Sequence, residues 1–247
     1  MPRGVAESMA TPSPKIRAVF FDLGGTLVDE RDYIGWTDAA RRHYLEFEPD
    51  ELVHAFRDVE AEMDGELSDH VVEFWQKVLS QAAQREVSLA TATRFTEDIR
   101  RQRAPYRLFS DSRRCLDELR EDGRKLGVIS NSNSEASVRR ILDQTGILEL
   151  FDTVTSSGTE GVCKPDPEIF RRALARAKVT IHEAFYVGNL LKTDALAARA
   201  AGIPSVWLHR DGIAFNEDPP EVTSLLEVPN WVRRLEGSPE KYPARRR

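Results

Sequence analysis

Short apolar runs alternate with amphipathic stretches along most of this chain, and this alternation limits its fold more than any other feature. Five runs have the length and apolar content of strands covered on both faces: 16–21, 125–129, 151–155, 184–187 and 205–208. Helix candidates lie between them, at 111–122, 135–144, 167–178 and 193–201. Glycines stand where helices often end in a left-handed residue: Gly123, Gly146 and Gly202. The pattern predicts an α/β fold with a doubly wound parallel sheet, whose ligands bind beyond the carboxyl ends of the strands.

Residues 32–106 interrupt the alternation directly after the first strand. Their apolar positions recur at helical spacing without a convincing strand, so we expect three or four helices, with breaks at Pro49 and Gly65. A helical block inserted here would lie above the strand ends, where a lid belongs. We therefore expect an α/β core of residues 15–31 and 107–235 and a smaller, all-helical cap domain of residues 32–106.

The ends of the chain and its charge exclude several classes of function. Residues 1–14 are expected to be a disordered leader and residues 236–247 a polar tail, and the leader lacks the apolar run of a signal peptide or membrane span. The formal net charge of −6 argues against a general nucleic-acid binder, and two cysteines without metal-ligand spacing argue against a zinc site. We expect a cytoplasmic monomer or homodimer without nucleic-acid or membrane partners.

Polar side chains follow the expected strands. Asp22 ends the first strand, Ser130 and Asn131 end the second, and Asp194 opens the helix after the fourth. Lys164 precedes a proline in a turn that its neighbours make rigid. Each residue alone has an ordinary interpretation as a turn, a helix cap or a solvated charge. Because the carboxyl ends of parallel strands meet at one edge of a sheet, the set predicts a binding site for an anion.

These motifs, in this order, resemble those of the haloacid dehalogenase-like hydrolases that carry a helical cap after the first motif. Residues 22–27 (Asp-Leu-Gly-Gly-Thr-Leu) resemble the DxDGT motif of that superfamily, Ser130 its hydroxyl motif and Lys164 its lysine motif. Residues 188–194 resemble its acidic metal motif, and the resemblance extends over residues 15–208. It implies a Rossmann-like core and hydrolysis of a small substrate.

The resemblance also assigns roles to residues. Asp22 would attack phosphorus and form an aspartyl-phosphate that water then hydrolyses, while Ser130 and Lys164 would hold the transferring group. The substrate-binding positions that it implies are Gly25, Thr26 and Asn131. The cofactor that it implies is Mg²⁺, and the ligands would be Asp22, the backbone carbonyl of Gly24, Asn189 and Asp194. A metal and a lysine beside a carboxylate nucleophile suit phosphoryl transfer, which needs spread negative charge to be neutralised.

Two positions depart from the superfamily pattern. Gly24 occupies the place of a second aspartate that serves as general acid and base, a contribution of roughly 10²–10⁴-fold in rate. Asp29, Glu30, a cap side chain or a water are the candidates to replace it. Asn189 stands where an acidic residue is common and removes one negative charge, so we expect weaker metal affinity. Candidates for the inner face of the cap are Tyr33, Trp36, Arg41, Arg42, His43, Arg101, Arg103 and Tyr106.

Three functions remain open from the sequence. The leading hypothesis is a Mg²⁺-dependent phosphatase that acts on a small phosphorylated metabolite. The second is a 2-haloacid dehalogenase, which attacks carbon and needs neither a metal nor an acid at Gly24, although the retained Asp194 favours a cation. The third is a catalytically weak binding protein that keeps the fold, a reading that Gly24 and Asn189 motivate together.

Overall fold

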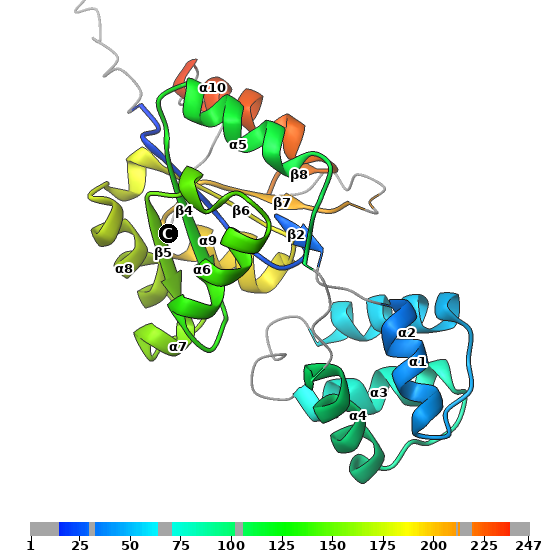
Figure 1. Cartoon of the computed structure of the whole chain (residues 1–247). Coiled ribbons are helices and arrows are strands. Elements are labelled where there is room, and N and C mark those ends of the chain that lie inside the picture. The colour runs from blue at the N-terminus through cyan, green and yellow to red at the C-terminus, as the bar shows by residue number, and fades with distance from the viewer. Residues whose placement is uncertain are drawn as a thin grey trace, which may run out of the picture.

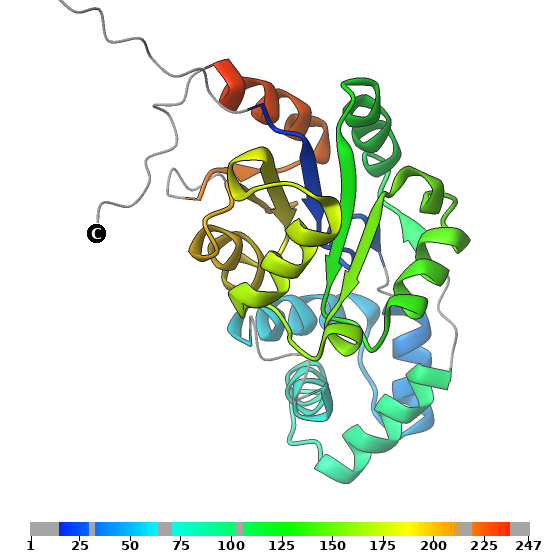
Figure 2. The same cartoon turned by 90° about the vertical axis from the view of Figure 1, so that its left-hand side faces the viewer.

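A parallel six-stranded sheet forms the centre of the protein (Figures 1 and 2). The computed structural model describes residues 15–29, 33–63, 71–101, 106–210, 212 and 219–237. The sheet order is β5-β4-β1-β6-β7-β8, and every adjacent pair of strands is parallel. The strands are β1 (Ala18–Phe21), β4 (Lys125–Ser130), β5 (Thr153–Ser156), β6 (Ala184–Gly188), β7 (Ser205–Leu208) and β8 (Glu221–Val222). The predicted α/β fold with a parallel sheet is confirmed, and β8 is a strand that the sequence pattern did not predict.

Helices cover both faces of this sheet, so the side chains of β1 alternate between two hydrophobic cores. Val19 and Phe21 lie in the core that α5 (Ser112–Glu121), α6 (Glu135–Gln144) and α10 (Val228–Gly237) cover. Ala18 and Phe20 lie in the opposite core, under α8 (Pro167–Ala177) and α9 (Ala197–Ala200). All four residues of β1 are buried, as a central strand with helices on both faces requires. The short remaining elements of the core are α7 (Ser157–Glu160) and the 3₁₀ turns η1 (Leu148–Leu150), η2 (Ile181–Glu183) and η4 (Leu225–Glu227).

The predicted helices of the core match the structure except in one place. α5, α6 and α8 occupy the expected ranges, and the three predicted glycines have φ of 76° (Gly123), 70° (Gly146) and 87° (Gly202). The fourth expected helix, 193–201, was wrong at its start. It begins as a π-helical turn, η3 (Leu191–Leu196), and becomes α-helical only in α9. The wider turn carries Asp194, whose carboxylate folds back to accept a hydrogen bond from the backbone N–H of Leu190.

Four helices follow the first strand and pack around a hydrophobic core of their own. They are α1 (Tyr33–Arg42), α2 (Pro49–Glu62), α3 (Val71–Ala82) and α4 (Leu89–Arg101). Pro49 is the first residue of α2, a position where its missing N–H costs nothing, and Gly65 lies outside the described residues. The chain leaves the core through β2 (Val28–Asp29) and returns through β3 (Arg107–Leu108), which pair antiparallel. In Figure 2 the arrows of β4 and β5 point toward this helical block.

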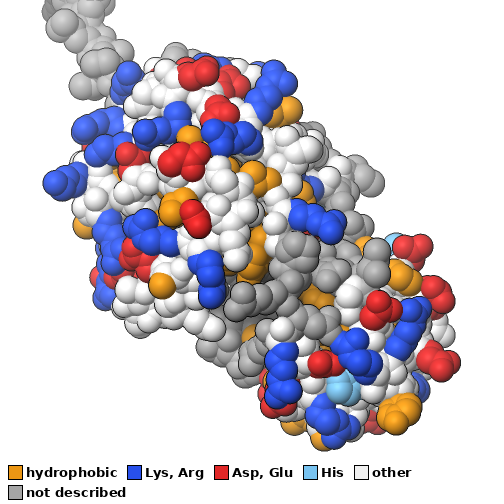
Figure 3. Space-filling model, viewed as in Figure 1, with side chains coloured by type: hydrophobic (Ala, Val, Ile, Leu, Met, Phe, Trp, Pro, Cys, Tyr) orange, Lys and Arg blue, Asp and Glu red, His pale blue; other side chains and the backbone are white. Residues whose placement is uncertain are grey.

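Charged side chains of both signs are interspersed over the face shown in Figure 3. Many charged side chains of the protein pair, as Arg233 of α10 does with Glu118 of α5 and with Asp122, the residue after that helix. Within the part of the chain that the structure describes, no helix combines the length and apolarity needed to cross a bilayer.

Candidate active site

Three charged side chains from distant parts of the chain meet under the carboxyl edge of the sheet. The Lys164 ammonium lies 2.7 Å from Asp22 Oδ1 and 2.6 Å from Asp194 Oδ1. Asp22 directly follows β1, Lys164 lies in the loop before α8, and Asp194 lies in η3 after β6. All three are nearly inaccessible, with 8%, 2% and 0% of their surface exposed. Sequence reasoning expected these residues at one sheet edge, and the structure brings them into direct contact.

The charges of this cluster depend on one another. Burial raises the pKa of Asp22 to about 6, although the Lys164 ammonium opposes this shift. Burial lowers the pKa of Lys164, but the attraction of Asp194 and Asp22 is larger and the pKa is raised overall. Lys164 is therefore a permanent cation at neutral pH, and Asp22 is mostly ionised there. An ionised carboxylate held by an ammonium at the end of a strand is suited to nucleophilic attack.

Asp194 is held by three groups of the protein. Its Oδ1 accepts hydrogen bonds from Lys164 and from the hydroxyl of Tyr186, at 2.6 and 2.8 Å. Its Oδ2 accepts the backbone N–H of Leu190 at 3.0 Å. A Cβ atom on Gly188 would come within 2.4 Å of the Asp194 side chain, so the glycine of this motif is what lets the carboxylate fold back. In this arrangement Asp194 positions Lys164, and its role as a metal ligand stays a prediction.

Sequence reasoning missed Tyr186. It stands in β6 among apolar residues and is fully buried, so the sequence alone suggests a core aromatic. Its hydroxyl nevertheless contacts both Lys164 and Asp194, at 3.1 and 2.8 Å. Burial raises the pKa of Tyr186 well above its usual value, so the hydroxyl keeps its proton and donates to Asp194. No sequence signal distinguishes such a tyrosine from one that only packs.

The turn after Asp22 is fixed by Asn189. Gly25 has a φ of 76°, and a Cβ there would lie 2.5 Å from Asn189 Nδ2, so both conformation and space demand glycine. The hydroxyl of Thr26 donates to Asn189 Oδ1 at 3.0 Å. Gly25 and Thr26 were predicted to bind substrate; the structure shows their contacts with Asn189, and substrate binding stays a prediction. Because the Asp22 backbone N–H also donates to Val187 O at 2.9 Å, the turn is anchored at both ends.

A second anchor of this turn was not predicted. Arg210, just beyond β7, donates to the backbone carbonyl of Thr26 at 2.7 Å. The same guanidinium forms a two-pronged ion pair with Asp111, at 2.9 and 3.0 Å, and stacks on the Phe109 ring. Burial raises the pKa of Asp111, but hydrogen bonds from Arg210, the backbone N–H of Leu225 and the Ser224 hydroxyl outweigh it, so the pKa is lowered. Arg210 and Asp111 therefore position the turn that carries the nucleophile candidate.

Asn131 also has a structural contact that the sequence did not reveal. Its amide donates to the backbone carbonyl of Lys164 at 2.9 Å and accepts the Lys164 backbone N–H at 2.8 Å. This pair of hydrogen bonds fastens the lysine loop to the end of β4. Asn131 was predicted to bind substrate; it lines the pocket described next, so one side chain can serve both roles.

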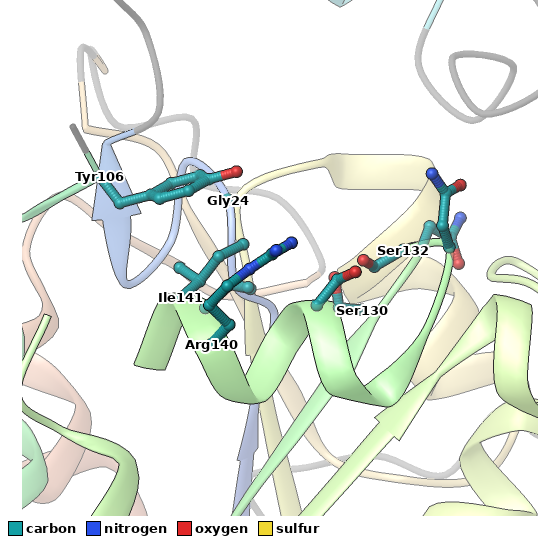
Figure 4. Close-up of a pocket in the computed structure, with 10 residues that line it drawn as sticks. Gly24, Tyr106, Ser130, Ser132, Arg140 and Ile141 are labelled. Carbon is teal, nitrogen blue, oxygen red and sulfur yellow. The ribbon is translucent and has the colours of Figure 1, made fainter. Parts of the chain in front are cut away.

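A pocket of about 320 Å³ adjoins the turn after Asp22 and the end of β4 (Figure 4). Ser130, predicted as a phosphate-holding hydroxyl, lies at the end of β4 with 7% of its surface exposed and lines the pocket together with Gly24. The other lining residues are Leu23, Tyr106, Asn131, Ser132, Asn133, Ser137, Arg140 and Ile141. Hydroxyl and amide groups dominate this lining, which suits a small polar ligand rather than an apolar one.

Of the residues expected on the inner face of the cap, Tyr106 lines the pocket. Trp36 instead packs into the core of the helical block, with ring centroids 5.5 Å from Phe56 and 4.9 Å from Trp75. Arg41 and Arg42 pair with carboxylates of the same block, those of Asp38 and Asp98. The side chains of Tyr33 and Arg103, and the acid candidate Glu30, lie outside the described residues.

The site offers oxygen donors for a magnesium ion, but few of them are charged. Among the described residues, no group of three or more Asp, Glu, His or Cys side chains is placed to hold a metal. Asp22 supplies one carboxylate, Gly24 two residues later supplies a backbone carbonyl, and Asn189, directly after β6, supplies an amide oxygen that also accepts the Thr26 hydroxyl. Mg²⁺ often needs only one or two protein carboxylates beside a substrate phosphate, so this donor set is sufficient in kind. Asp194 is less suited, because both of its oxygens already accept hydrogen bonds.

The chain is similar to known hydrolases. Residues 16–202 match the family model of the haloacid dehalogenase-like hydrolases. A phosphoserine phosphatase from Thermus thermophilus is 31% identical over 137 residues, which cover 56% of this chain and 53% of that enzyme. The chain thus spans about half the length of this relative. An (S)-2-haloacid dehalogenase from Pseudomonas sp. is 29% identical over 92% of this chain and 98% of its own length.

Solved structures show the same fold. A predicted phosphoglycolate phosphatase from Haemophilus somnus superposes with a TM-score of 0.66 at 21% identity, over 87% of this chain and 97% of the other. The parallel sheet and the family match over residues 16–202 indicate the same family. This chain belongs to the haloacid dehalogenase-like hydrolase family.

Proposed function

We propose that this protein is a Mg²⁺-dependent phosphatase that hydrolyses a small phosphorylated metabolite through an aspartyl-phosphate on Asp22. The observation that carries the proposal is the 2.7 Å contact between the Lys164 ammonium and the Asp22 carboxylate, beside a pocket lined by hydroxyls, amides and an arginine. A carboxylate paired with a buried ammonium, next to a polar space for an anion, supports this proposal. The phosphatase name of the Thermus relative supports the same substrate class.

The chemistry of the two steps can be assigned to residues of the chain. A carboxylate oxygen of Asp22 attacks phosphorus, the new O–P bond forms, and the bond from phosphorus to the leaving oxygen breaks. Lys164 and the Ser130 hydroxyl stabilise the negative charge on the phosphoryl oxygens. With Gly24 in place of an acid, the leaving oxygen takes its proton from water. A second water then hydrolyses the acyl phosphate and restores Asp22.

A bound Mg²⁺ would supply further positive charge for the phosphoryl group. The residues proposed to hold it are Asp22, the Gly24 carbonyl and Asn189, with Asp194 as the partner of Lys164. We also propose that the helical block of α1–α4, which leaves and rejoins the core through β2 and β3, is a cap domain over the substrate.

A dehalogenase is the second candidate, and one observation favours it. The similarity to the (S)-2-haloacid dehalogenase extends over nearly the whole of both chains. In that reaction Asp22 would attack carbon and release a halide, so the missing acid at Gly24 would carry no penalty. The Asp22–Lys164 contact is compatible with both reactions, and an assay must separate them.

A panel of phosphate monoesters and 2-haloacids, each assayed with Mg²⁺ or EDTA, tests the proposal. The expected result is phosphate release that EDTA abolishes and that Asp22→Asn reduces to background, with thermal melting to show that the variant folds. Asp143→Asn is the matched control, because Asp143 is an exposed residue on α6. Halide release that is independent of metal would establish the dehalogenase instead. Inactivity on the whole panel, with ligand binding retained, would favour a binding protein.

A further inference from the structure

The pocket beside Asp22 is lined by one cation and by no acidic side chain among the described residues. The cation is Arg140; the buried Lys164 is not part of the lining, and its charge is already matched by Asp22 and Asp194. Beside the pocket, the cluster of Asp22, Lys164 and Asp194 holds two carboxyl groups and one ammonium, so it offers an anionic substrate no net positive charge. The positive charge that lines the pocket itself is that of Arg140.

Arg140 is placed to reach a ligand. It lies on α6 three residues after Ser137 and directly before Ile141, and all three line the pocket. In Figure 4 its side chain extends from the helix into the space between Tyr106 and the serines at the end of β4. The neighbouring Arg139 behaves differently, because it pairs with Glu135 one turn earlier on the same helix.

The guanidinium of Arg140 has no protein partner among the described residues. Other exposed arginines of the core domain, such as Arg113 and Arg120, pair with carboxylates, whereas in the part of the chain that the structure describes no ion pair or hydrogen bond involves the Arg140 side chain. A planar guanidinium offers paired N–H donors that match the two oxygens of a carboxylate. Since Gly24 and Ser130 line the same pocket, a small molecule can present one end to the nucleophile turn and the other to Arg140.

We propose that Arg140 is a specificity-determining residue that binds a carboxylate of the substrate, so that the preferred substrates are small phosphomonoesters carrying a carboxylate a few atoms from the phosphate. The proposal rests on the phosphatase function proposed above and names the substrate class of that site. A volume of about 320 Å³ accommodates a molecule of this size. Arg140 is exposed, and charged hydrogen bonds to a carboxylate there are expected to contribute roughly tenfold in affinity.

The test compares two substrates that differ by a carboxylate, phosphoglycolate and ethyl phosphate. For the wild type, kcat/KM is expected to be at least tenfold higher for phosphoglycolate. Arg140→Gln should lower this ratio at least tenfold, mainly through KM, and Arg140→Lys should restore part of it. Arg139→Gln is the matched control and should keep the wild-type ratio. 1,2-Ethanediol bisphosphate tests whether a second phosphoryl group can replace the carboxylate. A higher kcat/KM for this probe than for phosphoglycolate would overturn the assignment of Arg140 to a carboxylate.

The outcomes separate this inference from the proposed function. If the wild type hydrolyses both esters equally well and Arg140→Gln leaves the ratio unchanged, Arg140 is not a specificity residue and the phosphatase assignment stands. If the wild type hydrolyses no phosphate ester, the proposed function fails. Calorimetry then still measures the affinity of Asp22→Asn for phosphoglycolate. A lower affinity after Arg140→Gln is added would support the carboxylate contact without turnover.

Discussion

The Lys164 ammonium lies 2.7 Å from the Asp22 carboxylate, and only 2% of the surface of the lysine is exposed to solvent. Lys164→Met would leave Asp22 and Asp194 buried without their shared counter-ion. Breaking a buried ion pair by removing one partner costs about 3–5 kcal/mol, so we expect a loss of this size in the free energy of unfolding. Urea titration at pH 7 measures it, and catalytic activity should fall to background.

Lys125→Met is the control for that substitution. Lys125 is half-buried in β4, and its ammonium donates to the backbone carbonyl of Ala177 at 2.8 Å. A hydrogen bond from a charged donor contributes about 1.5–3 kcal/mol, which is less than the loss expected for Lys164→Met. Similar losses in the two variants would show that the buried carboxylates do not depend on Lys164.

The pKa of Asp22 predicts how activity depends on pH. Burial raises this pKa to about 6 against the opposing charge of Lys164. Only the ionised carboxylate is a nucleophile, so kcat/KM should fall as the pH drops through about 6, tenfold for each further unit. A bound cation would favour the charged form of Asp22 and shift this acidic fall in kcat/KM to lower pH. A fall whose midpoint lies well above pH 6 would contradict this prediction.

Gly24→Asp tests whether a missing proton donor limits the reaction. Gly24 does not have the positive φ that Gly25 has, so its backbone accepts another residue. The new carboxyl should raise turnover of alkyl phosphates more than that of aryl phosphates, whose leaving groups need little protonation, with up to roughly 10²-fold for the former. Steady-state assays on an alkyl and an aryl ester measure it, and an equal gain on both would refute the idea.

Gly25→Asp is the contrast to that variant. Its φ of 76° and the 2.5 Å approach of a Cβ to Asn189 Nδ2 leave no room for a side chain. We expect it to lower the melting temperature, whereas Gly24→Asp leaves it nearly unchanged.

Much of the fold could be predicted from the sequence because it depends on local patterns. Apolar runs predicted the strands, and glycines such as Gly123 predicted where helices end. The parallel arrangement of the strands predicted that Asp22, Lys164 and Asp194 would lie at one edge of the sheet. The pattern could not say that Asp194 would fold back inside a π-helical turn. That geometry depends on the room left by Gly188 and on the hydroxyl of Tyr186.

The supporting contacts of the site could not be predicted, because they join residues far apart in the chain. Arg210 and Asp111 are separated by 99 positions. From the sequence alone, Arg210 is typical of a surface residue and Asp111 of a residue at the start of a helix. Asn131 is similar: nothing in its neighbours indicates that its amide would hold the backbone of Lys164. Side-chain direction in a folded core decides such contacts.

Arg210→Met tests the second anchor of the nucleophile turn. It removes the hydrogen bond to Thr26 O and the ion pair with Asp111, so we expect a loss of about 1.5–3 kcal/mol in the free energy of unfolding, together with a lower kcat. Arg233→Met, which removes an exposed arginine paired with Glu118 and Asp122, should cost less than about 1 kcal/mol.

The loss in Arg210→Met should itself depend on pH. The pKa of Asp111 is lowered in the folded protein, so its ion pair stabilises the fold above the unfolded pKa of about 3.9. This contribution disappears as the pH falls through the lower folded value. The difference between wild type and variant should therefore shrink in strong acid; a constant difference would mean that packing on Phe109 dominates.

Asn189→Asp tests the proposed ligands of the metal. The substitution keeps the oxygen that accepts the Thr26 hydroxyl and adds a negative charge at the turn that carries Asp22. Because Mg²⁺ is bound by hard, charged oxygens, we expect the Mg²⁺ concentration for half-maximal activity to fall about tenfold. Calorimetric titration of Mg²⁺ into the metal-stripped protein measures the affinity independently of turnover.

Asp194→Asn serves as the contrast: since Asp194 already binds Lys164, Tyr186 and the Leu190 N–H, its loss should destabilise the fold more than it weakens Mg²⁺ binding. An unchanged affinity in Asn189→Asp would place the cation elsewhere.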